Sequence, residues 1–350
     1  MTPLMTKTER AFNQAADWIT NCTSATDDKP ASDYKVWVVG EKDDVVAQLF
    51  TRKLYSNNFA PKKITNMAEL SVASKGFTPW KEGDVVVFFS RGDLSHHHLS
   101  QEALQRLDGI DSNSDTGRPN TILVTSQPNE NINEIFETMG GLILSTDLGD
   151  YDEDEPLSVH NAHEVSLNIS SNILSCLAAQ PFLTPEIYQR LHNQGYLGKS
   201  EAEIKNWDYK SALHFSQATL DNVPGNGSLD KIAQEISKNI KSGGKLLTAG
   251  VGKANFSGTA FVQMFQMLGL PAEELHATDA THGDLGQVEP NDIVLFISNS
   301  GLTDIIHEDI RVLEERFAHV EGHNVLQLAL TGNPEGKLAQ TFGSERTILT

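Results

Sequence analysis

The sequence predicts an α/β protein built from two doubly wound units, each with a mainly parallel sheet. Apolar, β-branched runs alternate with segments of helical periodicity along the chain, which is the pattern of βαβ units. These runs fall into two sets of similar spacing, one in each half of the chain. The length of 350 residues, of which 39% are hydrophobic, is enough for two ordinary cores. We therefore expect two domains, residues 1–212 and 213–350.

The strand and helix candidates follow from these patterns in chain order. The expected strands cover residues 35–39, 85–90, 121–125, 141–145, 245–249, 293–298, 325–329 and 346–350. The clearest helical segments cover residues 44–55, 158–179, 229–240 and 255–268. Because a parallel sheet is normally covered on both faces, we expect the second domain to lack the C-terminal helix that would cover its last strand.

The two sets of strands resemble copies of one unit. Val36 lies 49 positions before Val85, and Leu246 lies 47 positions before Ile293. A polar turn that ends in aspartate precedes the second expected strand of each set, at Asp84 and at Asp292. We interpret this as an internal duplication. The alternative is chance similarity, since βαβ spacing recurs widely.

The composition disfavours several classes of function. The chain has 27 basic and 47 acidic residues, a net charge of −20, so we expect neither nucleic acid nor a membrane surface as a partner. It has no apolar stretch long enough for a membrane span and no secretory signal pattern. Cys22 and Cys176 have no disulfide or metal-ligand spacing, which favours reduced thiols and a cytoplasmic location.

Two turns after expected strands carry phosphate-binding chemistry. In the first, Gly252 and Lys253 open a helix, where small residues let backbone N–H groups approach an anion. It lacks the full dinucleotide and P-loop patterns, and a tight turn with a surface lysine is the alternative. In the second turn, the sequence SNSGLT places three hydroxyls around one glycine at a helix start, as a phosphate nest does. A plain turn is the alternative there too.

A third segment, HATDATHGDLG, spans residues 276–286 and holds two histidines and two aspartates in what we expect to be a glycine-punctuated loop. Histidine can donate and accept protons near neutral pH, so His276 and His282 are acid/base candidates. Exposed loop histidines are the alternative. We expect no metal site at His96-His97-His98, because adjacent histidines on a helix point in different directions and have no suitably spaced partner.

The segments GVGK, HATDATHGDLG, SNSGLT and LTGNPEGKLA together resemble a sugar isomerase (SIS) domain, and among such domains the arabinose-5-phosphate isomerases, with their pattern GMGKSG, HPGEAAHGDLG, SNSGES, TGxPxSxLA. The resemblance covers about residues 213–350. It implies two flavodoxin-like three-layer α/β/α domains in tandem, no cofactor, and a sugar phosphate as the partner. It also implies a site completed across a homo-oligomer or across the tandem repeat.

The implied activity interconverts ribulose 5-phosphate and arabinose 5-phosphate through an enediolate. His282 is implied as the catalytic acid/base and Lys253 as the group that stabilises the enediolate oxygen. Ser298, Ser300 and Thr303 are implied to hold the phosphate. The full set of implied substrate-binding residues is Gly252, Lys253, His276, His282, Ser298, Asn299, Ser300, Gly301 and Thr303.

The second copy departs from the family pattern at three points, of which the first two favour an alternative, a non-catalytic phosphosugar sensor. Leu302 stands where the family has glutamate, and a leucine cannot move protons. The chain stops before the family's SHPGG segment, and the regulatory CBS pair is absent. The first copy looks degenerate, because its turns at residues 40–44 and 89–93 carry carboxylates that would repel a phosphate.

Overall fold

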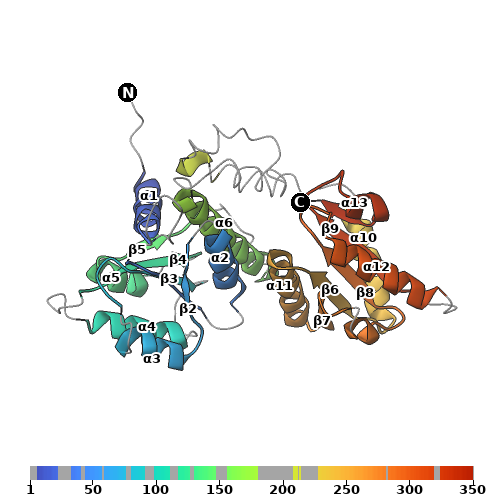
Figure 1. Cartoon of the computed structure of the whole chain (residues 1–350), viewed down its shortest axis with the longest axis horizontal. Coiled ribbons are helices and arrows are strands. Elements are labelled where there is room, and N and C mark those ends of the chain that lie inside the picture. Colours follow the sequence, from blue (N-terminus) through green and yellow to red (C-terminus); the bar gives the residue numbers. More distant parts are fainter. Residues whose placement is uncertain are drawn as a thin grey trace. The chain divides into compact units, whose positions relative to one another are not determined.

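The computed structural model describes residues 6–22, 33–40, 44–56, 59–75, 80–90, 98–110, 117–126, 130–146, 156–179, 208–211, 213, 228–280, 283–318 and 324–349. These residues form two compact units, which we call unit 1 (up to residue 213) and unit 2 (from residue 228) (Figure 1). Each unit has its own five-stranded parallel sheet. The predicted α/β class is therefore confirmed, while the boundary at residue 212 stays a prediction.

Unit 1 has helices on both faces of its sheet, whose strand order is β2-β1-β3-β4-β5. One face packs against α3, α4 and α5 through a buried apolar cluster, and α1, α2 and α6 pack together on the other. The elements are α1 (Lys7–Thr20), β1 (Val36–Val39), α2 (Val45–Ser56), β2 (Lys62–Ile64), α3 (Met67–Lys75), β3 (Val85–Ser90), α4 (His98–Asp108), β4 (Asn120–Thr125), α5 (Glu130–Thr138), β5 (Leu142–Leu144) and α6 (Pro156–Ala179).

Unit 2 has the strand order β10-β9-β8-β6-β7. Helices α12 and α13 pack on one face of its sheet, and α10 and α11 pack on the other. The elements are α10 (Ser228–Lys241), β6 (Leu246–Gly250), α11 (Lys253–Met267), β7 (Ala272–His276), the short 3-10 helix η3 (Asp284–Gln287), β8 (Ile293–Ile297), α12 (Asp304–Phe317), β9 (Leu326–Thr331), α13 (Lys337–Phe342) and β10 (Thr347–Leu349).

The two sheets have the same topology. Numbered within each unit, the strands run 2-1-3-4-5, which is the flavodoxin-like order. The central strands β3 and β8 are buried along their whole length, because helices cover both faces of each sheet. All of the expected strands are present, shifted by one or two residues at their ends.

In both units a buried aspartate forms equivalent hydrogen bonds with residues at the starts of the neighbouring strands. Asp84 accepts a hydrogen bond from the Lys35 amide at 2.9 Å, and Asp292 accepts one from the Lys245 amide at 2.9 Å. The carbonyl of each aspartate also accepts the amide of the first residue of the next strand, Asn120 or Leu326. The residue before each aspartate has a positive φ, 90° at Gly83 and 72° at Asn291. These matching bonds fit the proposed duplication.

The sequence did not predict the edge strands β2 and β7. In β7 only Ala272 and Leu275 are buried, and its two glutamates have low strand propensity. His276 is therefore the last residue of a strand and does not lie in a loop, which corrects the expectation for the 276–286 segment. Within the described residues, no helix has the length and apolar character needed to cross a membrane.

Candidate functional site

The strand register of unit 2 places three of the predicted segments at one edge of the sheet. Gly250, at the end of β6, pairs with His276 of β7 on one side and with Ile297 of β8 on the other. The turn with Gly252 and Lys253 therefore leaves the sheet between His276 and the 298–303 turn. The order of strands reverses at β6 and β8, and open α/β sheets bind ligands at such switch points, outside the carboxyl ends.

The 298–303 turn brings two of its three hydroxyl groups into contact. The Ser298 and Thr303 hydroxyls lie 2.9 Å apart, although five positions separate them in the chain. The Ser298 hydroxyl also accepts the Gly301 amide at 3.2 Å, and the Ser300 hydroxyl accepts the Leu302 amide at 3.3 Å. The Ser298 and Thr303 hydroxyls thus lie together just before α12, with Ser300 on the same turn, where the positive end of the helix dipole favours an anion.

The segment from the end of β9 to the start of α13 holds this turn through hydrogen bonds to the turn's carbonyl groups. The Asn299 carbonyl accepts the Thr331 hydroxyl at 3.2 Å and the Gly332 amide at 3.1 Å. The Ser300 carbonyl accepts the Asn333 side-chain amide at 3.1 Å, and the Gly301 carbonyl accepts the Leu338 amide at 3.0 Å. Because these carbonyls are bound inside the protein, the hydroxyl groups of the turn are the groups that a bound anion would meet.

Gly301 is required for this arrangement. Its φ is +65°, a conformation that residues with a side chain rarely adopt. A Cβ there would lie 3.2 Å from the Thr331 hydroxyl and 3.3 Å from the Gly336 Cα. A larger residue would therefore separate the 298–303 turn from the segment that supports it.

His307 and Arg316, both on α12, contact the loops of the site. The His307 Nε2 lies 3.0 Å from the Gly301 carbonyl, so this nitrogen carries the proton and donates it. At the other end of the helix, the Arg316 guanidinium donates to the carbonyls of Leu285 and Gly286. These carbonyls belong to the HGDLG loop, so one helix holds both the nest and the histidine-bearing loop.

The remaining predicted residues are placed as follows. Lys253 is the first residue of α11 and is exposed, next to Gly252 with a φ of +62°. His276 is exposed at the end of β7. His282 lies outside the described residues, as do His96, His97 and the first copy's turns at residues 41–43 and 91–93. In the described part of the chain, no group of histidine, cysteine or acidic side chains is arranged to hold a metal ion.

Asp309 is a buried acid below the site. It lies on the inner face of α12 with Ile306 and Leu313, and neither carboxyl oxygen has a hydrogen-bond partner within the described residues. Burial, with a smaller contribution from the negative charge of Glu308, raises the pKa of Asp309 to about 7. The carboxyl is therefore partly protonated near neutral pH, since burial disfavours its charged form.

Sequence reasoning assigned no role to His307, Arg316 or the segment that supports the nest. The only signal for that segment was its family-like sequence, LTGNPEGKLA, to which no function was given. Nothing in the sequence marks Arg316, because its partners are backbone carbonyls 30 and 31 positions away.

Residues 239–345 match the sequence profile of the SIS domain. Unit 2 contains a SIS domain. The matched range includes all three segments described above, from the turn at Gly252 to the 298–303 nest. The resemblance noted in the sequence is thus confirmed for this part of the chain.

Curated relatives of the SIS domain are named as arabinose 5-phosphate isomerases. The isomerase KdsD of Yersinia pestis is 36% identical over 97 residues, which are 28% of this chain and 27% of that protein. The isomerase GutQ of Salmonella typhi is 34% identical over 97 residues, 28% of each chain. The match therefore spans less than a third of the length of these relatives.

Solved structures of low sequence identity share the fold over the whole chain. A structure from Salmonella typhimurium LT2, of a protein named for sugar binding, has a TM-score of 0.54 and 12% identity, and covers 99% of this chain and 87% of that one. At this identity the likeness shows only that the chain has the two-unit α/β fold of such proteins.

Proposed function

We propose that the SIS domain binds a sugar phosphate and isomerises it between its ketose and aldose forms, with ribulose 5-phosphate and arabinose 5-phosphate as the pair. The observation that carries this proposal is the pairing of the Ser298 and Thr303 hydroxyls at the switch point of the sheet, with the Ser300 hydroxyl on the same turn. The names of the matched relatives support the reaction.

In this proposal the 298–303 turn holds the phosphate. Asn299 and Gly301 contribute backbone to the turn, and the α12 dipole adds to the attraction. The net charge of −20 does not prevent such binding, because the donors act locally on the anion. Gly252, Lys253 and His276 are proposed to contact the sugar part of the ligand, because they lie at the ends of the strands next to the 298–303 turn.

The chemistry requires one proton to move between two carbons. In the proposed reaction a base removes a proton from C1 of ribulose 5-phosphate, which gives an enediolate, and an acid returns a proton to C2 to form arabinose 5-phosphate. His282 is the proposed acid/base, because imidazole exchanges protons near neutral pH. Lys253 is proposed to stabilise the negative oxygen of the enediolate.

Leu302 favours a second candidate function, a phosphosugar sensor without catalysis. Its side chain is 59% exposed beside the nest, at the position where the matching family motif carries glutamate. An exposed leucine can neither accept nor donate a proton. A protein that kept the nest and lost this carboxylate would still bind the ligand.

Proton exchange measured by NMR in D2O tests the isomerase. Incubation of the full chain with ribulose 5-phosphate should give arabinose 5-phosphate that carries deuterium at C2. The variant His282→Ala should lose this activity, whereas His98→Ala in unit 1 should keep it. If no deuterium is incorporated but arabinose 5-phosphate binds saturably, the isomerase is excluded and the sensor is supported. Absence of binding as well would overturn both functions.

A further inference from the structure

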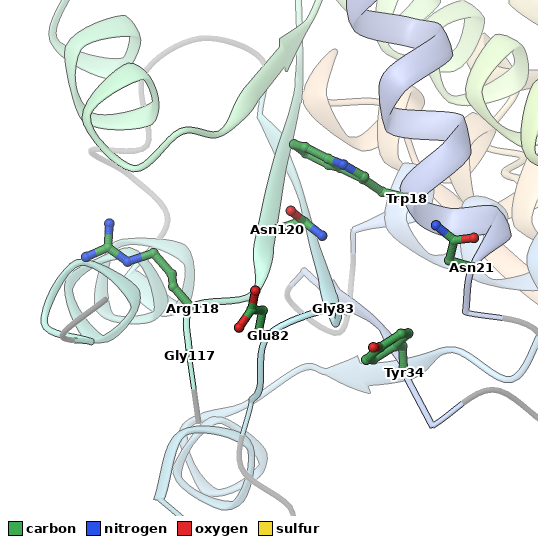
Figure 2. A pocket seen from close by; sticks show the side chains of 8 residues that line it. All are labelled: Trp18, Asn21, Tyr34, Glu82, Gly83, Gly117, Arg118 and Asn120. Carbon is green, nitrogen blue, oxygen red and sulfur yellow. The ribbon is translucent and has the colours of Figure 1, made fainter. Parts of the chain in front are cut away.

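Unit 1 has a cleft at the edge of its sheet opposite to the carboxyl ends of the strands. Its volume is about 550 Å3. Figure 2 shows the lining side chains, which come from the end of α1 and from the segments before β1, β3 and β4. The lining residues are Trp18, Asn21, Tyr34, Glu82, Gly83, Gly117, Arg118 and Asn120.

Unit 2 has different side chains at the positions equivalent to those that line the cleft. The strand registers make Tyr34 the counterpart of Gly244, Gly83 that of Asn291, and Arg118 that of Asn324. In unit 2 the Asn239 side chain donates to the Asn324 carbonyl at 2.7 Å, and Asn291 donates to the Ser242 carbonyl at 3.3 Å. Asparagines linked to the backbone thus occupy the region that is open in unit 1.

At the centre of this region each unit pairs one glycine with one larger residue, but at exchanged positions. In unit 2 a glycine lies against a larger residue, and a Cβ at Gly244 would lie only 1.9 Å from the Asn291 carbonyl oxygen. In unit 1 the glycine and the larger residue are exchanged, and a Cβ at Gly83 would lie 2.2 Å from the Tyr34 ring. The fold therefore does not require the cleft. The residues of unit 1 create it.

The groups that face the cleft suit hydroxyl groups and a flat apolar ring face. The Trp18 and Tyr34 rings provide apolar surface with polar edges. The Asn21 and Asn120 amides each offer donors and an acceptor, and the Glu82 carboxylate offers acceptors. Among the described residues, these three polar side chains make no hydrogen bond or ion pair with the protein.

Neither charged side chain that lines the cleft, Arg118 or Glu82, is placed to bind a phosphate, although the Lys81 ammonium lies over the Tyr34 ring, 5.3 Å from its centroid. Arg118 is tied to the protein, because its Nη2 donates to the carbonyls of Asp108 at 3.1 Å and Ile110 at 2.9 Å. In Figure 2 its guanidinium points away from Trp18 and Tyr34. The Glu82 carboxylate, by contrast, faces the cleft and would repel an anion.

We propose that unit 1 binds an uncharged saccharide in this cleft, with a sugar ring against the aromatic side chains and its hydroxyls on Glu82, Asn21 and Asn120. Unit 1 then has a ligand of its own at the amino ends of its strands, whereas the proposed phosphate site of unit 2 lies at the carboxyl ends of that unit's strands. This proposal does not depend on isomerase activity.

Saturation-transfer NMR on the full chain tests the proposal with D-arabinose, D-glucose and N-acetyl-D-glucosamine as probes. At least one of these sugars should bind saturably with a Kd below about 10 mM. Excess arabinose 5-phosphate should not displace it, and the variant Ser300→Ala should still bind it. Displacement by arabinose 5-phosphate would place the sugar in unit 2 and overturn the proposal, as would absence of binding for all three sugars.

Three variants locate the site. Trp18→Ala and Glu82→Gln should each weaken binding of the sugar at least about tenfold, since the first removes a ring face and the second replaces a charged acceptor oxygen by a donor. The double variant Tyr34→Gly/Gly83→Asn copies the arrangement of unit 2, and asparagine tolerates the positive φ at position 83. It removes the Tyr34 ring and should weaken binding at least about tenfold while circular dichroism shows a folded protein. Glu134→Gln, on the exposed face of α5, is the matched control and should bind normally. Retained binding in all three cleft variants would refute the assignment.

Discussion

At the scale of single residues, the nest depends on a few hydroxyl groups whose positions are now known. Ser298 is buried and bonded to Thr303, whereas Ser300 is half-buried and bonded only to the amide two positions ahead of it. Ser300 is thus the hydroxyl that can turn toward a ligand with the least loss inside the protein. This makes it the best position for testing phosphate recognition.

Ser300→Ala should weaken arabinose 5-phosphate binding by about 1.5–3 kcal/mol, the value of one hydrogen bond to a charged group. Isothermal titration calorimetry measures the change directly. Ser242→Ala, an exposed serine at the other edge of the same sheet, should leave affinity unchanged. Equal affinity for Ser300→Ala and the parent protein would argue against the nest.

The residue at position 302 distinguishes the two candidate functions, the isomerase and the sensor. Leu302→Glu should raise the isomerase rate, because it restores a carboxylate beside the nest that can move protons. The rate of deuterium incorporation at C2 is the measurement, and Leu302→Gln, which has the size of glutamate without its charge, is the control. If both variants exchange no faster than the parent, the missing carboxylate is not what limits the reaction.

Asp309 makes the stability of unit 2 depend on pH. Its pKa of about 7 in the folded protein lies above its ordinary value of 3.8. The unfolded chain therefore releases this proton first, and stability falls as pH rises from about 4 to 7. Asp309→Asn should stabilise unit 2 at pH 8 by about 1–3 kcal/mol and have little effect at pH 4.

Urea unfolding followed by circular dichroism at the two pH values measures the effect of Asp309→Asn. Glu314→Gln changes an exposed acid on the same helix and should shift neither curve. A stabilisation by Asp309→Asn that is as large at pH 4 as at pH 8 would contradict the ionisation argument.

At the scale of elements, α12 connects the two loops of the site. Its first two turns hold the nest through His307, and its last turn holds the HGDLG loop through Arg316. The helix lies against the core along a buried apolar stripe, so its ends keep a fixed separation. Residues that never touch the ligand can thereby determine the geometry of the site.

Arg316→Gln should lower the kcat of isomerisation about tenfold or more and leave arabinose 5-phosphate affinity nearly unchanged, because it releases the HGDLG loop and keeps the nest. Hydrogen exchange of the peptide that covers residues 283–290 should become faster. Arg311→Gln is the matched control on the same helix, since Arg311 pairs only with the exposed Glu308 and Glu315. Unchanged loop exchange in Arg316→Gln would show that the arginine does not position the loop.

At the scale of the whole molecule, two units of one topology have separate cores and equivalent aspartates at their strand starts. Asp84 accepts bonds from the Lys35 amide and from the Trp37 indole at 3.0 Å, and Asp292 accepts bonds from the Lys245 and Glu289 amides. Each aspartate belongs to one unit alone, so its loss should destabilise only that unit.

Asp84→Ala should lower the stability of unit 1, and Asp292→Ala that of unit 2, each by about 1.5–3 kcal/mol. No tryptophan lies in residues 228–349, so tryptophan fluorescence follows the unfolding of unit 1 while circular dichroism follows both units. Asp292→Ala should therefore move the circular dichroism transition and leave the fluorescence midpoint in place. A shift of both midpoints by Asp292→Ala would mean that the units unfold as one.

Much of this organisation follows from the sequence alone. Long apolar runs predict the central strands β1, β3, β6 and β8, because such strands are buried on both faces and must be apolar throughout. The contact of the Ser298 and Thr303 hydroxyls is likewise local, since a short turn between a strand and a helix brings residues five positions apart together. These features depend on residues that are close in the chain.

Only the tertiary structure decided the rest. The edge strand β7, which carries His276, is exposed on one side and shows little apolar signal of its own, so its pairing with β6 defines it. Arg316 and the support behind the nest act on backbone carbonyls about 30 positions away. The cleft of unit 1 arises from residues on separate segments, which the packing of α1 against the strand starts brings together. Backbone partners and distant neighbours leave no local pattern in a sequence, because they are selected by the packing of the whole unit.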